Sequence, residues 1–434
     1  MFELIAAGLL ATQGQSPALL QSSNLATWLD QGSARVLLEP QNAPDAGALD
    51  DLQTYLSELG YFGWIPRDQA VWVQSSEGVL ASHQGKVPLP AASLTKIATT
   101  LVALTTWGSN HRFETTVSAT GPIESGVLQG DLVVQGGSNP LFVWEEAIAL
   151  ANALQDLGIR QVTGQLIITG PFSMNYEEDP LVAGRLLRQA FDSRSWSGEV
   201  AQQYALMPAD TPRPTLRVSG GITALSPAQA ASLSPQRLAV HYSLPLDQLL
   251  RLMNLYSNNF MADLLAVELG GGTGLSRQVA TLTGVPQPEV QLINGSGLGV
   301  ENRLSARAAV AMLRAVEARL ISQGLGVMDV FPVAGIDVGT LKGRNLPEGT
   351  SVKTGTLAAV SALAGVMPTR DRGTVWFAII NQNGNLVELR AQQDYFLEDL
   401  ADRWGFAEPS DRPQRQVRLG DPARVEAATA PLAF

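Results

Sequence analysis

The spacing of hydrophobic and polar residues changes several times along the chain, and each change predicts a different kind of element. Two short runs at residues 70–76 and 79–83 lie either side of a turn and predict a β-hairpin. The proline-interrupted segment 87–90 cannot be helical throughout. It leads into a stretch of small, apolar and β-branched residues, 91–104, which is typical of a buried helix.

From about residue 113 to residue 239 the pattern is different, with glycine-rich turns between short strands. Strands are predicted at 130–137 and 164–170, and the spacing of apolar residues at 145–157 predicts an amphipathic helix between them. We interpret residues 113–239 as an inserted, smaller α/β domain.

The last third of the chain returns to longer elements. Residues 246–269 and 305–323 have helical patterns, and a further helix is predicted at 386–404. Three strand-like runs precede that last helix, at 352–357, 361–366 and 374–380. The short turns between them favour an antiparallel meander.

The two ends of the chain are predicted to lie outside these domains. Residues 1–22 are either a poor signal sequence or a short apolar helix that could contact a membrane peripherally, and the sequence leaves both open. Residues 406–434, rich in Pro, Arg and Ala, are predicted to form a mobile tail. This leaves residues 23–112 and 240–405 to form one domain around the insertion.

The composition excludes several classes of function. With 45% hydrophobic and 16% charged residues the chain is globular, and its net charge of −11 argues against a nucleic-acid partner. It has no cysteine, and His83, His111 and His241 are too far apart for metal-ligand spacing. The sequence therefore predicts no metal site.

The helix predicted at 91–104 carries the strongest chemical signal. Ser93 and Lys96 lie three residues apart at its start and so share a face. A buried lysine loses part of its proton affinity and can then accept the serine proton, which activates a hydroxyl without histidine. Only Lys96, among four lysines, has a serine three residues before it.

Two further motifs follow in order, Ser257-Asn258-Asn259 and Lys353-Thr354-Gly355-Thr356. Taken singly, the first is more often a helix cap and the second a strand end with a turn. Together with the Ser93 motif they match the Ser-x-x-Lys, Ser-x-Asn and Lys-Thr-Gly set of active-site-serine enzymes.

Each motif residue has a task in acyl transfer. Ser257, on a turn between helices, can relay a proton to the leaving amine, and Asn259 can hydrogen-bond the substrate backbone and Lys96. Lys353 adds positive charge, and Gly355 lets the substrate approach the strand closely. The backbone N–H groups of Ser93 and Thr356 would form the oxyanion hole.

With these motifs the chain resembles the class C low-molecular-mass penicillin-binding proteins, the D-alanyl-D-alanine carboxypeptidase/endopeptidase family. Five other segments also resemble it: 90–96, 130–137, 253–262, 294–298 and 332–341. The family usually has Asp where Asn294 stands and a different sequence at 136–140. The 164 residues from Ser93 to Ser257 are also a short interval for it.

The resemblance implies a β-lactamase/transpeptidase-like domain, an antiparallel sheet with helices on both sides, combined with the inserted α/β domain. It implies removal of the terminal D-Ala from peptidoglycan stem peptides through an acyl-enzyme on Ser93, and acylation by β-lactams. The hydroxyls of Thr354 and Thr356 would hold the substrate carboxylate near Lys353. The resemblance also includes endopeptidase activity on cross-links, for which the short insertion is a departure from the family. The reaction that the resemblance implies calls for no organic cofactor.

Two alternatives remain open at the level of sequence. One is a β-lactamase or esterase of the same fold, and the other is a non-catalytic protein that binds cell wall. The substrate implies a location in the periplasm or cell envelope.

Overall fold

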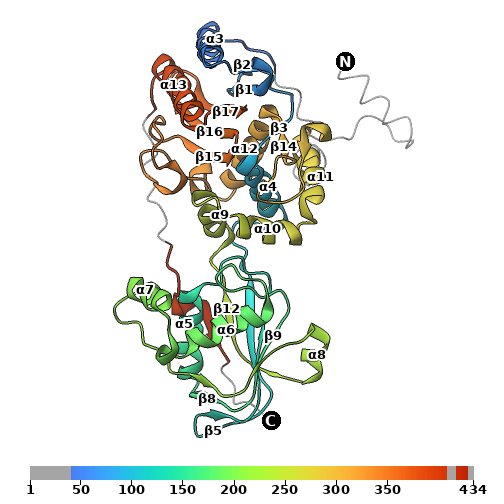
Figure 1. Ribbon diagram of the computed structural model, residues 1–434, viewed down its shortest axis with the longest axis vertical. Coiled ribbons are helices and arrows are strands. Elements are labelled where there is room, and N and C mark those ends of the chain that lie inside the picture. The colour runs from blue at the N-terminus through green and yellow to red at the C-terminus, as the bar shows by residue number, and fades with distance from the viewer. Residues whose placement is uncertain (1–40, 408–416, 429–434) are drawn as a thin grey trace, which may run out of the picture.

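The structure is a computed structural model that describes residues 41–407 and 417–428. The predicted segment 1–22 lies outside the described residues. The chain forms two domains stacked along the long axis of the molecule, with a narrow waist between them (Figure 1). We call them the larger domain and the inserted domain.

The larger domain is built on a five-stranded antiparallel sheet. The strand order is β15-β16-β17-β1-β2, so β15 is an edge strand. The bounds are β1 Gln69–Gln74, β2 Val79–His83, β15 Ser351–Leu357, β16 Val360–Thr369 and β17 Gly373–Gln382. The predicted hairpin and the predicted meander are therefore parts of one sheet, joined through β1 and β17.

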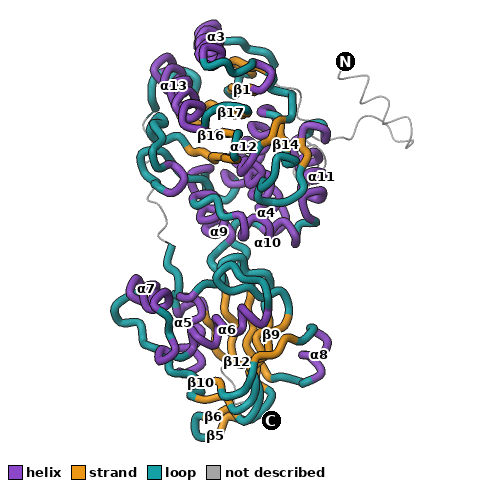
Figure 2. The backbone as a smooth tube through the Cα atoms, in the orientation of Figure 1, coloured by secondary structure: helices purple, strands orange, loops and turns teal. Residues whose placement is uncertain are grey.

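Helices cover both faces of this sheet, as predicted (Figure 2). Alternate residues of β17 point to opposite cores: Phe377 and Ile379 pack with helices α3 and α13, while Ala378 and Ile380 pack with α4 and α12. The bounds are α3 Ala46–Tyr61, α4 Thr95–Trp107, α12 Ala306–Ile321 and α13 Leu386–Trp404.

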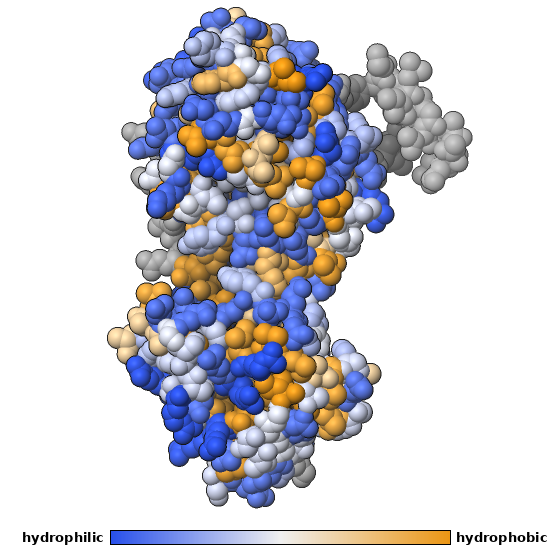
Figure 3. All heavy atoms as spheres, viewed as in Figure 1, coloured by the Kyte–Doolittle hydropathy of each residue, from blue (hydrophilic) through white to orange (hydrophobic). Residues whose placement is uncertain are grey.

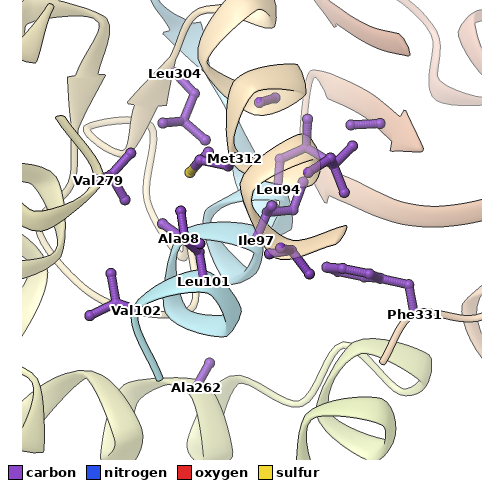
Figure 4. Packing of buried hydrophobic residues seen from close by; sticks show 14 of the residues in the cluster. Leu94, Ile97, Ala98, Leu101, Val102, Ala262, Val279, Leu304, Met312 and Phe331 are labelled. Carbon is purple, nitrogen blue, oxygen red and sulfur yellow. The ribbon is translucent and has the colours of Figure 1, made fainter. Parts of the chain in front are cut away.

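Helix α4 is buried on nearly every side. Leu94, Ile97 and Leu101 have no exposed surface, and Figure 4 shows them packed among Ala262, Val279, Leu304, Met312 and Phe331 from the surrounding elements. Burying each such side chain stabilises the fold by about 1.5–3 kcal/mol. The residues that precede and begin α4 are therefore held on a rigid support.

The helical pattern at 246–269 is two helices, α9 Leu246–Leu255 and α10 Asn259–Glu268, and not one. Ser257, in the break between them, has φ +53°, which a continuing helix cannot accommodate. The Asn258 side chain then accepts a hydrogen bond from the Met261 N–H (3.0 Å) and caps α10. Helix α11 Gly271–Thr283 completes this side of the domain.

The inserted domain contains a six-stranded mixed sheet in the order β11-β9-β7-β4-β12-β18. Its strands are β4 Glu114–Ala119, β7 Leu132–Gln135, β9 Leu166–Thr169, β11 Ile222–Ala224, β12 Gln236–Tyr242 and β18 Val425–Ala427. A small second sheet consists of β5 Ile123–Glu124, β6 Val127–Leu128, β8 Gln161–Val162 and β10 Arg217–Val218. Its helices are α5 Trp144–Asp156, α6 Pro180–Phe191, α7 Gly198–Leu206 and α8 Pro227–Ser232.

The prediction of a mobile tail from residue 406 fails for residues 417–428. Strand β18 pairs antiparallel with β12, which itself continues past the predicted boundary at 239. Beside it, the buried Arg424 donates to Glu146 Oε1 (2.6 Å), and His241 Nε2 lies 2.7 Å from Glu146 Oε2. The end of the described chain therefore belongs to the inserted domain.

The two domains also meet through side chains. Ser138 of the inserted domain donates to Glu268 of α10 (2.6 Å), and the Tyr176 ring packs edge-on against Phe260 at 5.7 Å. On the face shown in Figure 3, hydrophobic residues gather around the waist, where the domains approach each other. No helix within residues 41–407 and 417–428 combines the length and hydropathy required to cross a membrane.

Candidate active site

Ser93 lies in a single 3₁₀ turn, Ala92–Leu94, that leads directly into α4. The preceding residue, Ala92, has φ +47°, and the Ala91 N–H donates to the carbonyl of Asn302 (2.9 Å). Short strand β3, Leu89–Pro90, pairs with β14, Arg303–Leu304, just before this turn. Ser93, the candidate nucleophile, thus lies on a sharp turn that is held on one side by the pairing with β14 and on the other by α4.

Lys96 is the centre of the hydrogen-bond network. Its Nζ donates to Ser93 Oγ (3.0 Å), to Asn259 Oδ1 (2.8 Å) and to the carbonyl oxygen of Ser296 (2.8 Å). Three separate segments are therefore tied to one amine, whose side chain has no exposed surface.

Burial lowers the pKa of Lys96 from 10.5 to about 7, and the negative charge of Asp263 offsets part of that effect. About half of the amine is then neutral at pH 7. A neutral amine 3.0 Å from Ser93 Oγ can accept the serine proton.

Asp263 and the 294–298 loop support this amine from behind. Asp263 Oδ1 accepts from the N–H groups of Gly295 (3.0 Å) and Ser296 (2.8 Å), which aims the Ser296 carbonyl at Lys96. Gly297, with φ +82°, lies so close to the Ala92 carbonyl that a Cβ atom would overlap it. Only glycine satisfies both conditions.

Ser257 and Lys353 form a second pair beside the first. Lys353 Nζ donates to Ser257 Oγ (3.1 Å) and to the carbonyl of Thr354 (2.7 Å). Burial and the positive charge of Lys96 hold the pKa of Lys353 well below its usual value. A proton can thus pass between Ser257 and Lys353.

The edge strand β15 closes the site. A Cβ at Gly355 would lie 2.9 Å from the Ala91 carbonyl oxygen and 3.1 Å from the Ser93 nitrogen, so the strand runs directly against the nucleophile turn. Thr354 is nearly buried, whereas Thr356 is exposed and its Oγ1 accepts from Arg390 Nη2 (2.8 Å).

All eight predicted site residues therefore converge on one region: Ser93, Lys96, Ser257, Asn259, Lys353, Thr354, Gly355 and Thr356. Sequence reasoning missed Asp263 and Arg390, and it quoted Ser296 only within a matching segment. Within the described residues no group of His, Asp and Glu side chains could hold a metal ion.

Comparisons with known proteins identify the family to which the chain is similar. The model of the D-Ala-D-Ala carboxypeptidase 3 (S13) family matches residues 67–178 and 215–400. Carboxypeptidase DacB of Mycolicibacterium smegmatis is 27% identical over 334 residues, covering 69% of this chain and 72% of the relative. D-alanyl-D-alanine carboxypeptidase DacB of Haemophilus influenzae is 24% identical over 75% of this chain and 86% of its own.

Solved structures share the fold. The peptidoglycan endopeptidase Bd3459 of Bdellovibrio bacteriovorus superposes with a TM-score of 0.69 at 20% identity, covering 83% of this chain and 98% of that one. Penicillin binding protein 4 of Haemophilus influenzae gives 0.57 at 19% identity, covering 81% and 99%. With its motif residues gathered in one site and the family model matching most of its length, the chain belongs to the D-Ala-D-Ala carboxypeptidase 3 (S13) family of serine peptidases.

Proposed function

We propose that the protein removes the terminal D-Ala from peptidoglycan stem peptides, with Ser93 as the nucleophile and Lys96 as its general base. The observation that carries this proposal is the Lys96 amine, which is buried, has a pKa of about 7 and lies 3.0 Å from Ser93 Oγ. A lysine placed only for structure would not need this combination.

In the acylation step, Ser93 Oγ attacks the carbonyl carbon between the two D-alanines while its proton moves to Lys96 Nζ. The Ser93 and Thr356 N–H groups would receive the oxyanion, since Gly355 brings β15 against the Ser93 turn. Asn259, already bonded to Lys96, would fix the substrate amide.

The leaving D-Ala nitrogen then needs a proton. Ser257, bonded to Lys353, can donate its hydroxyl proton to that nitrogen and be reprotonated by Lys353. The C–N bond breaks, D-Ala leaves, and an ester joins Ser93 to the remaining peptide. Water then attacks this ester and its proton passes through Ser257 to Lys353, which gave one up in the previous step. Lys96 returns to Ser93 Oγ the proton that it took during acylation, and the free enzyme is restored.

The partners follow from this chemistry. Peptidoglycan stem peptides are the substrates, and β-lactams, whose reactive amide is part of a ring, acylate Ser93 and stay attached. The protein acts where that substrate lies, in the periplasm or cell envelope. The family membership and the peptidases among the relatives support this assignment.

Intact-protein mass spectrometry after incubation with benzylpenicillin tests the proposal. Ring opening releases no leaving group, so wild-type protein should gain the mass of the whole drug, and Ser93→Ala should gain nothing. A folded wild type that leaves the drug intact and gains no mass would favour the non-catalytic binding protein. Consumption of the drug without a trapped adduct would favour the β-lactamase alternative.

A further inference from the structure

We propose that Arg390 binds the free α-carboxylate of the residue that is removed, and thereby restricts the enzyme to substrates whose leaving D-amino acid carries that carboxylate. The inference rests on the proposed function and names its specificity-determining residue. Motif reasoning does not single out Arg390.

The first observation is the position of the guanidinium. Arg390 Nη2 donates to Thr356 Oγ1 (2.8 Å), and Thr356 is an exposed residue on the edge strand beside the nucleophile turn. A peptide that lies along β15 with its scissile carbonyl at Ser93 places its last residue near Thr354 and Thr356. The guanidinium is therefore next to the place where the terminal carboxylate must lie.

The second observation is that the sheet itself fixes this position. Gln393, one turn after Arg390 on α13, donates to the Ser361 carbonyl (3.1 Å) and to Asn381 Oδ1 (2.7 Å). Ser361 is the register partner of Thr356 in the β15–β16 ladder. Helix α13 is thus anchored at the strand pair that carries Thr356. The packing of this helix on the sheet therefore holds Arg390 close to Thr356.

The third observation concerns charge. The amines of Lys96 and Lys353 have no exposed surface, and burial lowers the pKa of both. A guanidinium stays charged at all physiological pH values and matches a carboxylate with two parallel N–H groups. Of the described side chains that hydrogen-bond to the predicted site residues, Arg390 alone is a guanidinium.

The fourth observation is that Arg390 keeps donors available. Other arginines of the larger domain are already committed to carboxylates, as Arg344 is to Asp394 and Arg251 is to Asp337. Arg390 makes no ion pair in the described part of the chain and is half-buried. Its remaining N–H groups can donate to a substrate oxygen while Nη2 stays on Thr356.

The test compares two peptides that differ only at the carboxylate: diacetyl-Lys-D-Ala-D-Ala and the same peptide with a C-terminal amide. We expect wild type to prefer the acid strongly. Arg390→Gln should lower kcat/KM for the acid by about 10- to 100-fold, the range of a lost charge-assisted hydrogen bond, and leave the amide within about twofold. Arg390→Lys keeps the positive charge but loses the two parallel N–H groups of the guanidinium. Its kcat/KM for the acid should therefore lie between those of wild type and Arg390→Gln.

Arg185→Gln is the matched control, since Arg185 is an exposed arginine of the inserted domain and its loss changes net charge equally. It should leave both rates unchanged. Equal losses for acid and amide in Arg390→Gln would mean that Arg390 only positions Thr356, and would overturn the proposal. An unchanged preference for the acid would overturn it as well.

A second pair of reagents separates this inference from the proposed function. If wild type releases no D-Ala but is still acylated by penicillin, the acylation rates of benzylpenicillin and of its methyl ester provide the same comparison between a free carboxylate and a blocked one. The inference then stands if Arg390→Gln slows only the free acid. A wild type inert to both peptides and both drugs would overturn the proposed function and this inference together.

Discussion

The pKa of Lys96 provides the sharpest test of the proposed mechanism. With its pKa at about 7 this amine is about half neutral at pH 7, whereas an ordinary lysine at 10.5 would be neutral in about one molecule in 3,000. Burial thus raises the concentration of the base about 10³-fold. Acylation should rise about tenfold per pH unit below 7 and level off above 8.

Asp263→Asn is the perturbation that moves this profile. The negative charge of Asp263 raises the pKa of Lys96, and its oxygen also holds the N–H groups of Gly295 and Ser296. Asparagine keeps an oxygen acceptor and removes only the charge. Loss of a nearby opposite charge should lower the pKa of Lys96 by about one to two units, at about 1.4 kcal/mol per unit.

The assay is the second-order rate of acylation by a fluorescent penicillin between pH 5 and pH 9, which reports the free enzyme. Wild type should show an inflection near pH 7, and Asp263→Asn should show it at lower pH with a lower plateau, because a weaker base transfers the proton less well. An inflection that stays in place, or moves to higher pH, would refute the assignment of Lys96 as the base.

Three further variants test other parts of the structure. Gly297→Ala forces a Cβ against the Ala92 carbonyl and should slow acylation, measured with the same penicillin, by about 10²-fold. The melting temperature should change little. Lys96→Met should abolish acylation and yet stabilise the fold. The lowered pKa means that Lys96 destabilises the wild type by about 5 kcal/mol, whereas the three hydrogen bonds lost in the variant contribute about 1 kcal/mol each. The free energy of unfolding of Lys96→Met, measured in urea at pH 7, should therefore exceed that of wild type by about 2 kcal/mol. That gain should shrink as pH rises from 7 toward 10.5, because the unfolded lysine loses its proton there; a constant gain would contradict the pKa. Arg424→Ala leaves buried Glu146 without its guanidinium and should destabilise the inserted domain by about 3 kcal/mol, and equal stability by calorimetry would show that the ion pair contributes nothing net.

The sequence predicted the architecture of the larger domain well, because its elements carry strong periodic patterns. Strand β17 of the meander is apolar on both faces, and α4 consists mainly of small, apolar and β-branched residues, as deeply buried elements do. The apolar spacing at 246–269 continues across Ser257 and shows no break, so the Ser257-Asn258-Asn259 motif is the signal that indicates a turn between helices, and the positive φ of Ser257 agrees with it. Strand β18 was not predictable, because its three residues form no hydrophobic run and have no periodic pattern. They form a strand because they pair with β12.

The site divides in the same way. Ser93 and Lys96 were predictable because three residues on a helix determine their separation, and Lys353 because its motif marks a strand end. Asp263 and Arg390 were not, since each acts through a partner far away in sequence: the Ser296 N–H for Asp263 and the Thr356 hydroxyl for Arg390. Contacts of that kind depend on tertiary packing and leave no spacing to read.

Strand β18 has a consequence for the order in which the protein can assemble. The inserted domain has its first strand at residue 114 and its last at residue 427, with the whole second half of the larger domain between them. During synthesis from the N-terminus, β12 therefore waits with an unpaired edge until about 180 further residues have been made. Newly made chains expose a template for pairing with their neighbours throughout that interval. Chains truncated before β18 would keep the catalytic motifs, and the edge of β12 would stay unpaired.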